Sequence, residues 1–248
     1  MRFILIGDVH GCIDELKILI SECKLNTGDY IFFLGDLINK GPNSIGVLNY
    51  VLFLSEYYKV KLIIGNHEEK LLRFLYNKKN NLKAFNQMNL QFDYYELEKN
   101  ISPQILKFLE KGYFSYRIPE LDILLIHGGL TKNCKLDFKT NNFRYDLHSY
   151  GEFKELKLIT MTRFLDKNGK FVSLGKEDEN SKFWADDYEG KFGLVFFGHH
   201  VFLNDEPRNF KNAIGLDGGC VFGGYLFAYI LEGNEKSWIK VKAQKKYF

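Results

Sequence analysis

Carboxylate, amide and imidazole groups follow apolar runs at several places in the sequence. FILIGDVHG, FFLGDL and KLIIGNHEE each end in glycine followed by Asp or Asn, and DILLIHGG and LVFFGHH end in glycine beside His. The residues with ligand-forming side chains in these segments are Asp8, His10, Asp36, Asn66, His67, His127, His199 and His200. Five of the six histidines therefore stand beside glycine at the end of an apolar run, which indicates one shared site.

These residue types are suited to divalent transition metals. Imidazole and carboxylate mixed with an amide oxygen bind Mn, Fe, Zn, Co or Ni, and Mn is our first choice for assays in vitro. Two such ions roughly 3.5–4 Å apart clamp a phosphate, lower the pKa of a bridging water and stabilise an in-line displacement. The natural bridge between the ions is a carboxylate. The side chains therefore predict a two-metal site and hydrolysis without a covalent enzyme intermediate.

An alternating pattern of strands and helices positions the first of these residues. Apolar runs at residues 2–6 and 30–34 and in VKLIIG predict buried strands. DELKILISECK and residues 44–58, the latter opened by Ser44, predict helices. This order implies right-handed crossovers and a largely parallel sheet. Sites in such sheets form beyond the carboxyl ends of the strands, where the polar residues stand.

The remainder of the chain predicts a second sheet. Residues 68–111 are expected to form a helical excursion over one side of the site, and residues 131–183 a long loop region. Aromatic or β-branched segments separated by glycines predict a mixed or antiparallel sheet; they are YFSYRI, DILLIHGG, GLVFFGHH, AIGLDGG, GGYLFAYILEG and SWIKVKA. We predict an α/β (α+β) fold with one domain over residues 1–248, in which two mixed sheets pack face to face between helices.

Composition limits the possible functions and partners. The 248 residues are 46% hydrophobic and 26% charged, which is typical of a globular enzyme. A net charge of +3 does not favour a stable nucleic acid partner or an anionic membrane. Four cysteines without CxxC spacing predict reduced, buried thiols. No signal peptide or transmembrane run is evident, so we expect a cytoplasmic protein, and the oligomeric state stays open.

The ordered motifs GDVHG, GDLINKG, GNHEE, HGG and GHH together resemble those of a known family, the calcineurin-like metallophosphoesterases. Within that family they resemble the branch of the phosphoprotein phosphatases and their bacterial nucleotide-cleaving relatives. The resemblance runs from Phe3 to about Leu226. It implies a four-layer fold, a double β-sandwich flanked by helices, in agreement with the strand pattern above.

The resemblance also implies roles for individual residues. Asp8 and His10 are expected to bind the first metal, Asp36 to bridge both, and Asn66, His127 and His199 to complete the second metal; Asp36 would thereby also be essential to catalysis. His67, beside a ligand but not one itself, is expected to be the general acid that protonates the leaving oxygen. Asn66, Lys40 and Arg163 are expected to contact the substrate phosphate.

One stretch departs from the phosphoprotein phosphatase pattern. That family usually carries Asp-Arg-Gly where this chain has Asn39-Lys40-Gly41. Asn39 can accept a hydrogen bond from His67 but brings no charge to support the imidazolium. Lys40 supplies a charge without the bidentate fork of arginine. The departure weakens the case for a phosphoprotein substrate and leaves phosphoester cleavage intact.

Two substrate classes stay open at this point. LIGDVHGCIDELKILI and GDLINKGPNSIGVLNYV are similar to symmetrical bis(5′-nucleosyl)-tetraphosphatases, whereas HGG and GHH favour the phosphoprotein phosphatases. Our leading hypothesis is symmetrical cleavage of diadenosine tetraphosphate or a related dinucleotide; the alternative is a Ser/Thr or broad-specificity phosphoprotein phosphatase. For its polyphosphate chain, a dinucleotide needs further positively charged side chains, for which Lys40, Arg163 and Arg144 are candidates. It also needs a ledge for a base, which the aromatic residues of 85–95 could supply.

Other assignments are weaker. His200 either reaches the substrate or is structural, and His148 is expected to be an ordinary loop residue. A catalytically silent binding module would have lost a metal ligand, and none of the expected ligands is missing from the sequence. A nuclease would show a basic stripe interleaved with aromatic residues, and the sequence shows none.

Overall fold

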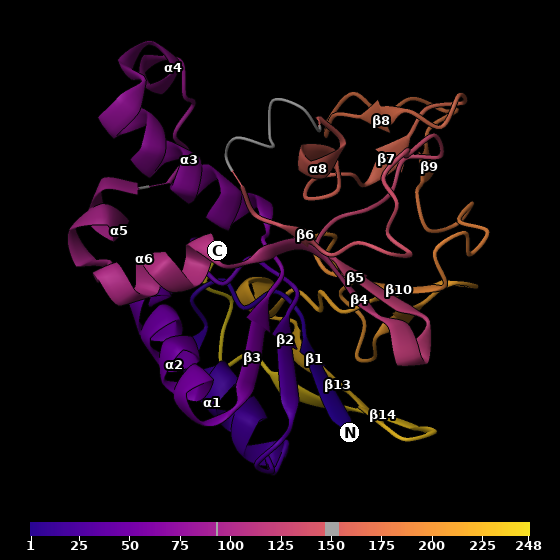
Figure 1. Ribbon diagram of the computed structural model, residues 1–248, viewed down its shortest axis with the longest axis horizontal. Helices are drawn as coiled ribbons and strands as arrows, with labels where there is room; N and C mark the ends of the chain where they lie inside the picture. Colours follow the sequence, from indigo (N-terminus) through magenta and orange to yellow (C-terminus); the bar gives the residue numbers. More distant parts are fainter. Residues whose placement is uncertain (93, 147–153) are drawn as a thin grey trace.

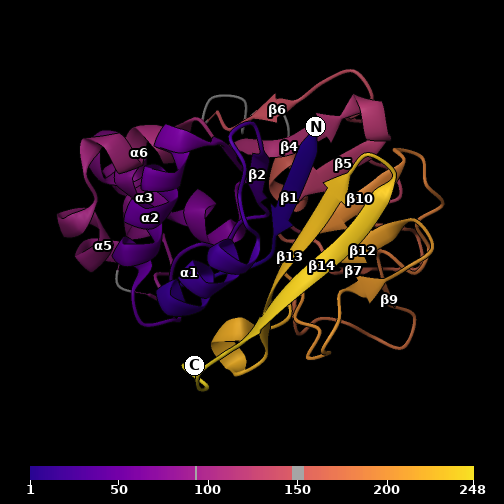
Figure 2. The same cartoon turned by 90° about the horizontal axis from the view of Figure 1, so that it is seen from below.

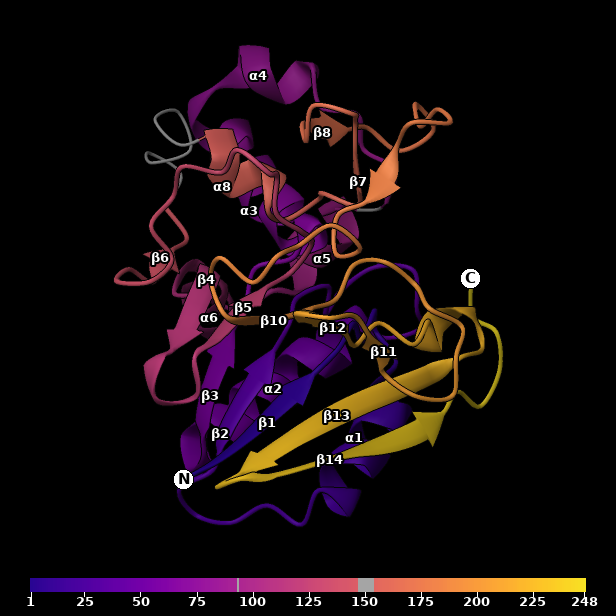
Figure 3. The same ribbon diagram turned by 90° about the vertical axis from the view of Figure 1, so that its right-hand side faces the viewer.

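The computed structural model describes residues 1–92, 94–146 and 154–248. Its centre is formed by two β-sheets that pack face to face (Figure 1). Helices lie against the outer face of the first sheet, and loops with short elements lie against the second (Figure 3). The prediction of two mixed sheets flanked by helices is confirmed.

The first sheet has the strand order β14-β13-β1-β2-β3. Its parallel part consists of β1 (Arg2–Ile6), β2 (Tyr30–Phe33) and β3 (Lys59–Leu62). The long hairpin of β13 (Tyr225–Glu232) and β14 (Glu235–Lys242) extends it, because β13 pairs antiparallel with β1 (Figure 2). Our assignment of these last two strands to the second sheet was wrong. The apolar pattern of a strand marks its buried faces but does not identify its neighbour.

The second sheet is mixed and has the order β11-β12-β10-β5-β4-β6. Neighbours β12, β10 and β5 are parallel, whereas β4, β6 and β11 run antiparallel to their partners. Its strands are β4 (Tyr113–Ile118), β5 (Ile123–Ile126), β6 (Phe143–Arg144), β10 (Leu194–Phe197), β11 (Arg208–Asn209) and β12 (Ala213–Gly215).

A dry layer of side chains joins the two sheets. Phe32 and Leu5 of the first sheet and Phe196 and Leu125 of the second are fully buried in it. The rings of Phe196 and Tyr229 meet across it with centroids 5.0 Å apart. Burying large apolar side chains contributes roughly 1.5–3 kcal/mol each, so this layer holds the sheets in a fixed relation. A second apolar cluster lies beneath the helices.

The helices follow the strands of the first sheet. α1 (Ile13–Glu22) and α2 (Ser44–Tyr57) lie against it, and after β3 come α3 (Asn66–Asn80), α4 (Leu82–Asn86), α5 (Tyr94–Asn100) and α6 (Pro103–Glu110). Asn43, not Ser44, caps α2, because its side chain accepts a hydrogen bond from Gly46 N at 2.7 Å. Ser44 Oγ instead accepts a hydrogen bond from the backbone N–H of Asn39 at 2.8 Å.

Residues 131–183 contain elements that the sequence did not predict. The described residues here include β6, α8 (Lys154–Leu158) and a small third sheet of β7 (Phe164–Leu165), β8 (Phe171–Val172) and β9 (Lys182–Phe183). Two-residue strands are too short to show alternation, which explains why they escaped prediction. His148 lies outside the described residues. Two short 3₁₀ turns, η1 (Pro119–Leu121) and η2 (Cys220–Phe222), complete the fold.

The cysteines agree with the expectation of buried thiols. All four cysteines are buried and none forms a disulfide. In the part of the chain that the structure describes, every helix is too short or too polar to cross a membrane.

The loops that follow β1, β2 and β3 are tied to one another. The amide of His10 donates to Asp36 O at 2.8 Å, which joins the first two loops. Glu68, in the first turn of α3, is fully buried and accepts from the amides of Asp36 and Leu37 at 2.8 Å and of Gly65 at 3.1 Å. One carboxylate therefore fixes the end of β2 against the start of α3.

The glycine before Asp36 is required by its surroundings, which leads to a first prediction. Gly35 has φ +98°, and a Cβ there would lie 2.5 Å from His127 Nδ1 and 2.7 Å from Gly65 N. Gly35→Ala should lower the free energy of unfolding by about 2–5 kcal/mol, measured by urea denaturation, through backbone strain and steric overlap. The control Gly175→Ala has φ +79° but nothing within 4 Å, and should lose only about 1–2 kcal/mol. Equal losses would contradict the steric argument.

The carboxylate of Glu68 gives a second prediction. In Glu68→Gln the amide NH₂ must face at least one backbone N–H donor, so the free energy of unfolding should fall by about 2–3 kcal/mol. Measurements belong at pH 8, above the pKa of Glu68, which burial and then the charge of Asp36 raise to about 7. Glu98→Gln, which removes a half-exposed ion pair with Lys78, is the control and should cost under about 1 kcal/mol. A loss no larger than in the control would refute the tethering role.

Candidate metal centre

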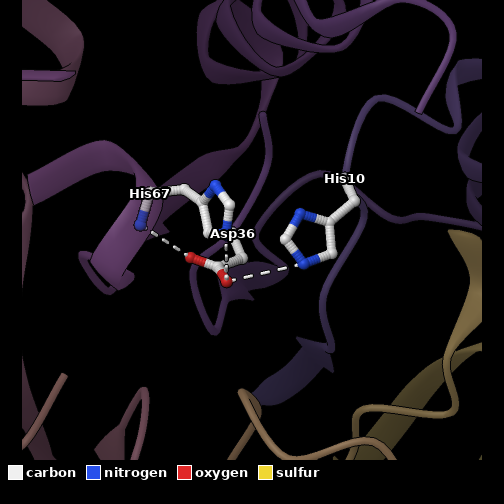
Figure 4. Close-up of side chains that lie close together, drawn as sticks. All are labelled: His10, Asp36 and His67. Carbon is white, nitrogen blue, oxygen red and sulfur yellow. Dashed lines mark hydrogen bonds and ion pairs between the residues drawn. The ribbon is translucent and has the colours of Figure 1, made fainter. Parts of the chain in front are cut away.

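Asp36 occupies the middle of the site, at the end of β2 and between the sheets. Its Oδ2 lies 3.5 Å from His10 Nε2 and 3.8 Å from His67 Nε2, and its Oδ1 lies 3.4 Å from His127 Nε2. Figure 4 shows His10, from the loop after β1, and His67, from the start of α3, around this carboxylate. The predicted convergence of the strand ends therefore places three imidazoles around one carboxylate.

Two groups of potential ligands share that carboxylate. His10, Asp36 and His67 form one, and Asp36, His127 and His199 form the other; within each group the ligand atoms lie within 4.8 Å of one another. All five side chains are buried. A carboxylate common to two adjacent ligand sets is what a bridging ligand requires. The residues present therefore fit two cations.

The hydrogen bonds of the rings leave the appropriate nitrogens for metal binding. His10 Nδ1 lies 2.9 Å from Ile38 O and His127 Nδ1 lies 2.6 Å from Leu34 O. Because a carbonyl oxygen only accepts, both Nδ1 atoms carry the proton and both Nε2 atoms face the site. Among the described residues, the buried Nε2 of His199 has no hydrogen-bond partner, an arrangement that a cation would satisfy.

Asp8 and Asn66 border the two groups. Asn66 Oδ1 lies 3.2 Å from His127 Nε2, so these two atoms must share either a proton or a cation. Asp8 Oδ2 lies 3.9 Å from His10 Nε2, and both of its oxygens accept from His199 N at 3.1 Å. All six residues expected to bind metal thus lie together.

The charges of the site favour cations. Burial raises the pKa of Asp36, but the charges of His127 and His67 outweigh it and hold the pKa of Asp36 well below its usual range. Burial lowers the pKa of His127, yet Asp36 outweighs it and raises the pKa of His127 to about 9. Burial, and next Asp217, raise the pKa of Asp8 well above its usual value. A buried carboxyl such as Asp8, which resists ionisation beside other carboxylates, is stabilised in its charged form by a nearby cation.

The other imidazoles are held neutral. Burial, opposed by Asp36 and helped by Lys40, lowers the pKa of His10 to about 3. Burial and then the Arg163 guanidinium lower the pKa of His199 well below its usual value. A neutral imidazole is the form that binds a metal ion.

His67 and Asn39 pair differently from expectation. Asn39 Nδ2 lies 2.9 Å from His67 Nδ1 and 3.4 Å from the Tyr94 hydroxyl. The amide therefore donates to Nδ1, whereas we expected it to accept from the ring, and the proton of the neutral imidazole resides on Nε2. The Tyr94 oxygen explains the orientation, because it offers the amide nitrogen a second acceptor. Burial, opposed by Asp36, lowers the pKa of His67 to about 4.

A cavity of about 1000 Å³ opens onto these residues. Lys40 and Arg163, both expected to contact phosphate, line it together with Asn66, His67 and His199. Lys40 Nζ lies 2.8 Å from His10 Nε2, and Arg163 Nη2 donates to His199 O at 3.0 Å. Both positively charged side chains therefore lie beside the ligand groups.

Two weaker candidates lie elsewhere. The ring of His200 packs against Phe183 and Phe202, with centroids 4.8 and 4.9 Å away, in an aromatic cluster. Arg144 lies over the ring of Tyr113 at 5.0 Å. These contacts indicate a structural role for both residues. Neither is among the residues that line the cavity.

Sequence reasoning missed two residues that shape the site, Phe248 and Glu68. Phe248 lines the cavity together with Phe92, which belongs to the segment 85–95 that the sequence offered as a ledge for a base. Asp217, in the segment GLDGG, is buried near Asp8 and Lys40. Glu68 was available in the motif GNHEE, but its three backbone partners are visible only in the fold. Phe248 is distant in sequence from every motif, so no local signal marked it.

The backbone is unusual at the same positions. Seven described residues other than glycine have positive φ, and five of them belong to the site: His10, Asp36, Asn39, Lys40 and His199, with φ between 45° and 68°. Positive φ is sparsely populated by such residues and concentrates where function requires it. For His199 it means that β10 has ended, so adjacent His199 and His200 no longer alternate as on a strand.

Comparisons with known proteins agree with this geometry. Residues 1–203 match the family model described as calcineurin-like phosphoesterase. The chain is 29% identical, over 100% of its length and 94% of the relative, to the bis(5′-nucleosyl)-tetraphosphatase PrpE, named asymmetrical, of Oceanobacillus iheyensis. It is 28% identical, over 97% of its length and 98% of the relative, to the symmetrical bis(5′-nucleosyl)-tetraphosphatase of Buchnera aphidicola subsp. Baizongia pistaciae.

A solved structure extends the comparison to the fold. The crystal structure of a protein titled a putative diadenosine tetraphosphatase superposes with a TM-score of 0.71, at 26% identity, over 98% of this chain and 93% of that one. Since the family model covers most of the chain and the site has the expected ligand sets, this chain belongs to the calcineurin-like phosphoesterase family.

Proposed function

We propose that this chain is a dinuclear-metal hydrolase that cleaves diadenosine tetraphosphate or a related dinucleoside polyphosphate symmetrically. The observation that carries the metal-dependent chemistry is the Asp36 carboxylate shared by two buried ligand groups. The names of the two relatives and of the similar crystal structure support the substrate class.

Six residues of this chain would hold the two cations. Asp8 and His10 would hold one, Asn66, His127 and His199 the other, and Asp36 both. When bound, such a pair of ions neutralises phosphate charge and activates water for in-line attack. His67 also falls in the first geometric group, and the metal content of a His67 variant distinguishes an acid from a ligand.

The surrounding side chains bind and protonate the substrate. Lys40 and Arg163 contribute positive charge along the cavity wall, where the phosphate chain would lie. His67 carries its proton on Nε2, in the cavity, and Asn39 fixes the ring through Nδ1. To act as the acid the ring must take up a second proton, which the negative charge of a bound phosphate favours; as an imidazolium, His67 would then pass its Nε2 proton to the departing phosphate oxygen while the Asn39 amide oxygen accepts from Nδ1.

The aromatic residues of the cavity support a nucleotide over a small phosphoester. Phe92 and Phe248 have ring centroids 6.1 Å apart, and Phe92 lies 5.1 Å from the ring of His67. A cavity of this size is at the upper end of the range for small-molecule sites, and stacking on an aromatic side chain contributes roughly 1–3 kcal/mol per base. An adenine would thus fit beside the leaving group.

The runner-up is a phosphoprotein phosphatase of broad specificity. Its support is the resemblance of GNHEE and HGG to that branch. A phosphopeptide needs an open groove at the metals, but it makes no use of the two cavity phenylalanines.

The metal roles yield a prediction for two variants. Asp36→Asn should abolish metal-dependent turnover and lower the metal bound per chain, because the shared charge is lost. His67→Asn should keep the metal content of the wild type and lose about 10²- to 10⁴-fold in kcat, because only the acid is removed. Metal is measured by inductively coupled plasma mass spectrometry and turnover with p-nitrophenyl phosphate. Near-normal turnover in Asp36→Asn would refute the two-metal site, and metal loss in His67→Asn would make His67 a ligand.

The substrate is tested directly on the purified protein with Mn²⁺. Diadenosine tetraphosphate is incubated, its products are resolved by ion-exchange chromatography, and a phosphothreonine peptide is assayed in parallel. Two equivalents of ADP are expected. ATP with AMP would keep the hydrolase but contradict symmetrical cleavage. Intact dinucleotide with phosphate released from the peptide would favour the runner-up.

The two cavity phenylalanines, Phe92 and Phe248, give a related prediction. Phe92→Ala should raise the KM for diadenosine tetraphosphate about 5- to 100-fold, the loss expected for one stacked base, without changing the hydrolysis of p-nitrophenyl phosphate. Phe53→Ala, at a half-exposed ring on α2 outside the cavity, is the control and should change neither. An unchanged KM in Phe92→Ala would place the base elsewhere.

A further inference from the structure

A second cluster of potential ligands lies away from the cavity. Cys12, Glu15 and Cys220 place their sulfur and carboxylate atoms within 4.8 Å of one another. Their exposed fractions are 0%, 0% and 1%. Cys12 is the residue just before α1, Glu15 lies in the first turn of that helix, and Cys220 begins η2. Two thiols and a carboxylate from segments far apart in sequence thus meet in the interior.

The carboxylate of Glu15 is only half satisfied. Its Oε1 accepts from Gln244 N at 2.9 Å and from the Tyr247 hydroxyl at 2.7 Å. Its Oε2 is buried and has no hydrogen-bond partner among the described residues. A buried, unpartnered carboxylate oxygen is costly unless a cation or donor satisfies it. The same carboxylate belongs to a group whose other members are two sulfur atoms, the ligands that zinc prefers.

We propose that Cys12, Glu15 and Cys220 form a third, mononuclear metal site for zinc, separate from the dinuclear centre. Ligand sulfurs on a tetrahedral zinc ion stand about 3.8 Å apart, given Zn–S bonds of about 2.3 Å, so side-chain shifts of about 1 Å suffice to close the site. Three protein ligands leave the fourth tetrahedral position to water.

The position of this site indicates its effect on the fold. Cys12 follows the loop that contains His10, and Gln244 and Tyr247, which bind Glu15, follow β14. The next residue, Phe248, lines the cavity. A zinc ion here would therefore clamp the end of the chain and η2 against the first loop of the site. Its ligands would be two thiolates and a carboxylate, whereas the two ligand groups of the dinuclear centre consist of imidazoles and a carboxylate.

Cobalt substitution tests the proposal independently of catalysis. The full-length protein is stripped with a chelator under reducing conditions and titrated with Co²⁺. Only a thiolate ligand gives an intense sulfur-to-cobalt charge-transfer band in the near ultraviolet, so the dinuclear centre is silent in this readout. The wild type should show the band and bind three equivalents of Co²⁺.

Variants assign the band to the cluster. Cys220→Ser and Glu15→Gln should bind one equivalent less; the first should lose most of the band, and both should retain hydrolysis of p-nitrophenyl phosphate. Cys134→Ser, at another buried thiol, is the matched control and should behave as the wild type. Absence of the band from the reduced wild type would overturn the proposal whatever the variants do. So would a band that persists in Cys220→Ser, or a thiol count showing that Cys12 and Cys220 form a disulfide.

Discussion

A charged carboxylate buried between two sheets is the constraint on which this structure depends. Asp36 is 2% exposed, and burial alone would protonate it, yet the imidazoles around it keep its pKa low. Those three imidazoles come from the loop after β1, the first turn of α3 and the loop after β5, so the two sheets must meet at this edge for the charge to be tolerated. The packing layer between them, centred on residues such as Phe32 and Phe196, therefore serves the site as well as stability.

The same constraint explains the unusual backbone. Asp36 and His10 turn inward only with left-handed φ values, which are strained for residues with a side chain. The hydrogen bond between their loops and the three amides held by Glu68 offset that strain. Gly35 makes room for His127, since any side chain there would overlap its ring. Strain at the site is thus sustained by buried contacts just outside it.

The C-terminal hairpin links the fold to the substrate side. β13 completes the first sheet beside β1, and the residues before and after the hairpin reach back to the loops of the site. Cys220 approaches Cys12, and Phe248 lies beside Phe92 in the lining of the cavity. Binding of a metal or a base at these points would therefore depend on segments that carry none of the family motifs, and relatives with the same motifs can differ there in specificity.

The sequence alone determined the fold class, the strand ends that converge and the six residues that gather around two ligand groups, because each motif couples a buried strand to a polar turn. It did not determine which sheet receives β13 and β14, because a strand's apolar pattern is the same beside any partner. The orientation of Asn39, the separation of His200 from the cavity, and the approach of Phe248 and Cys220 were decided by tertiary structure alone. Each depends on contacts between residues far apart in the chain, and such contacts leave no local pattern.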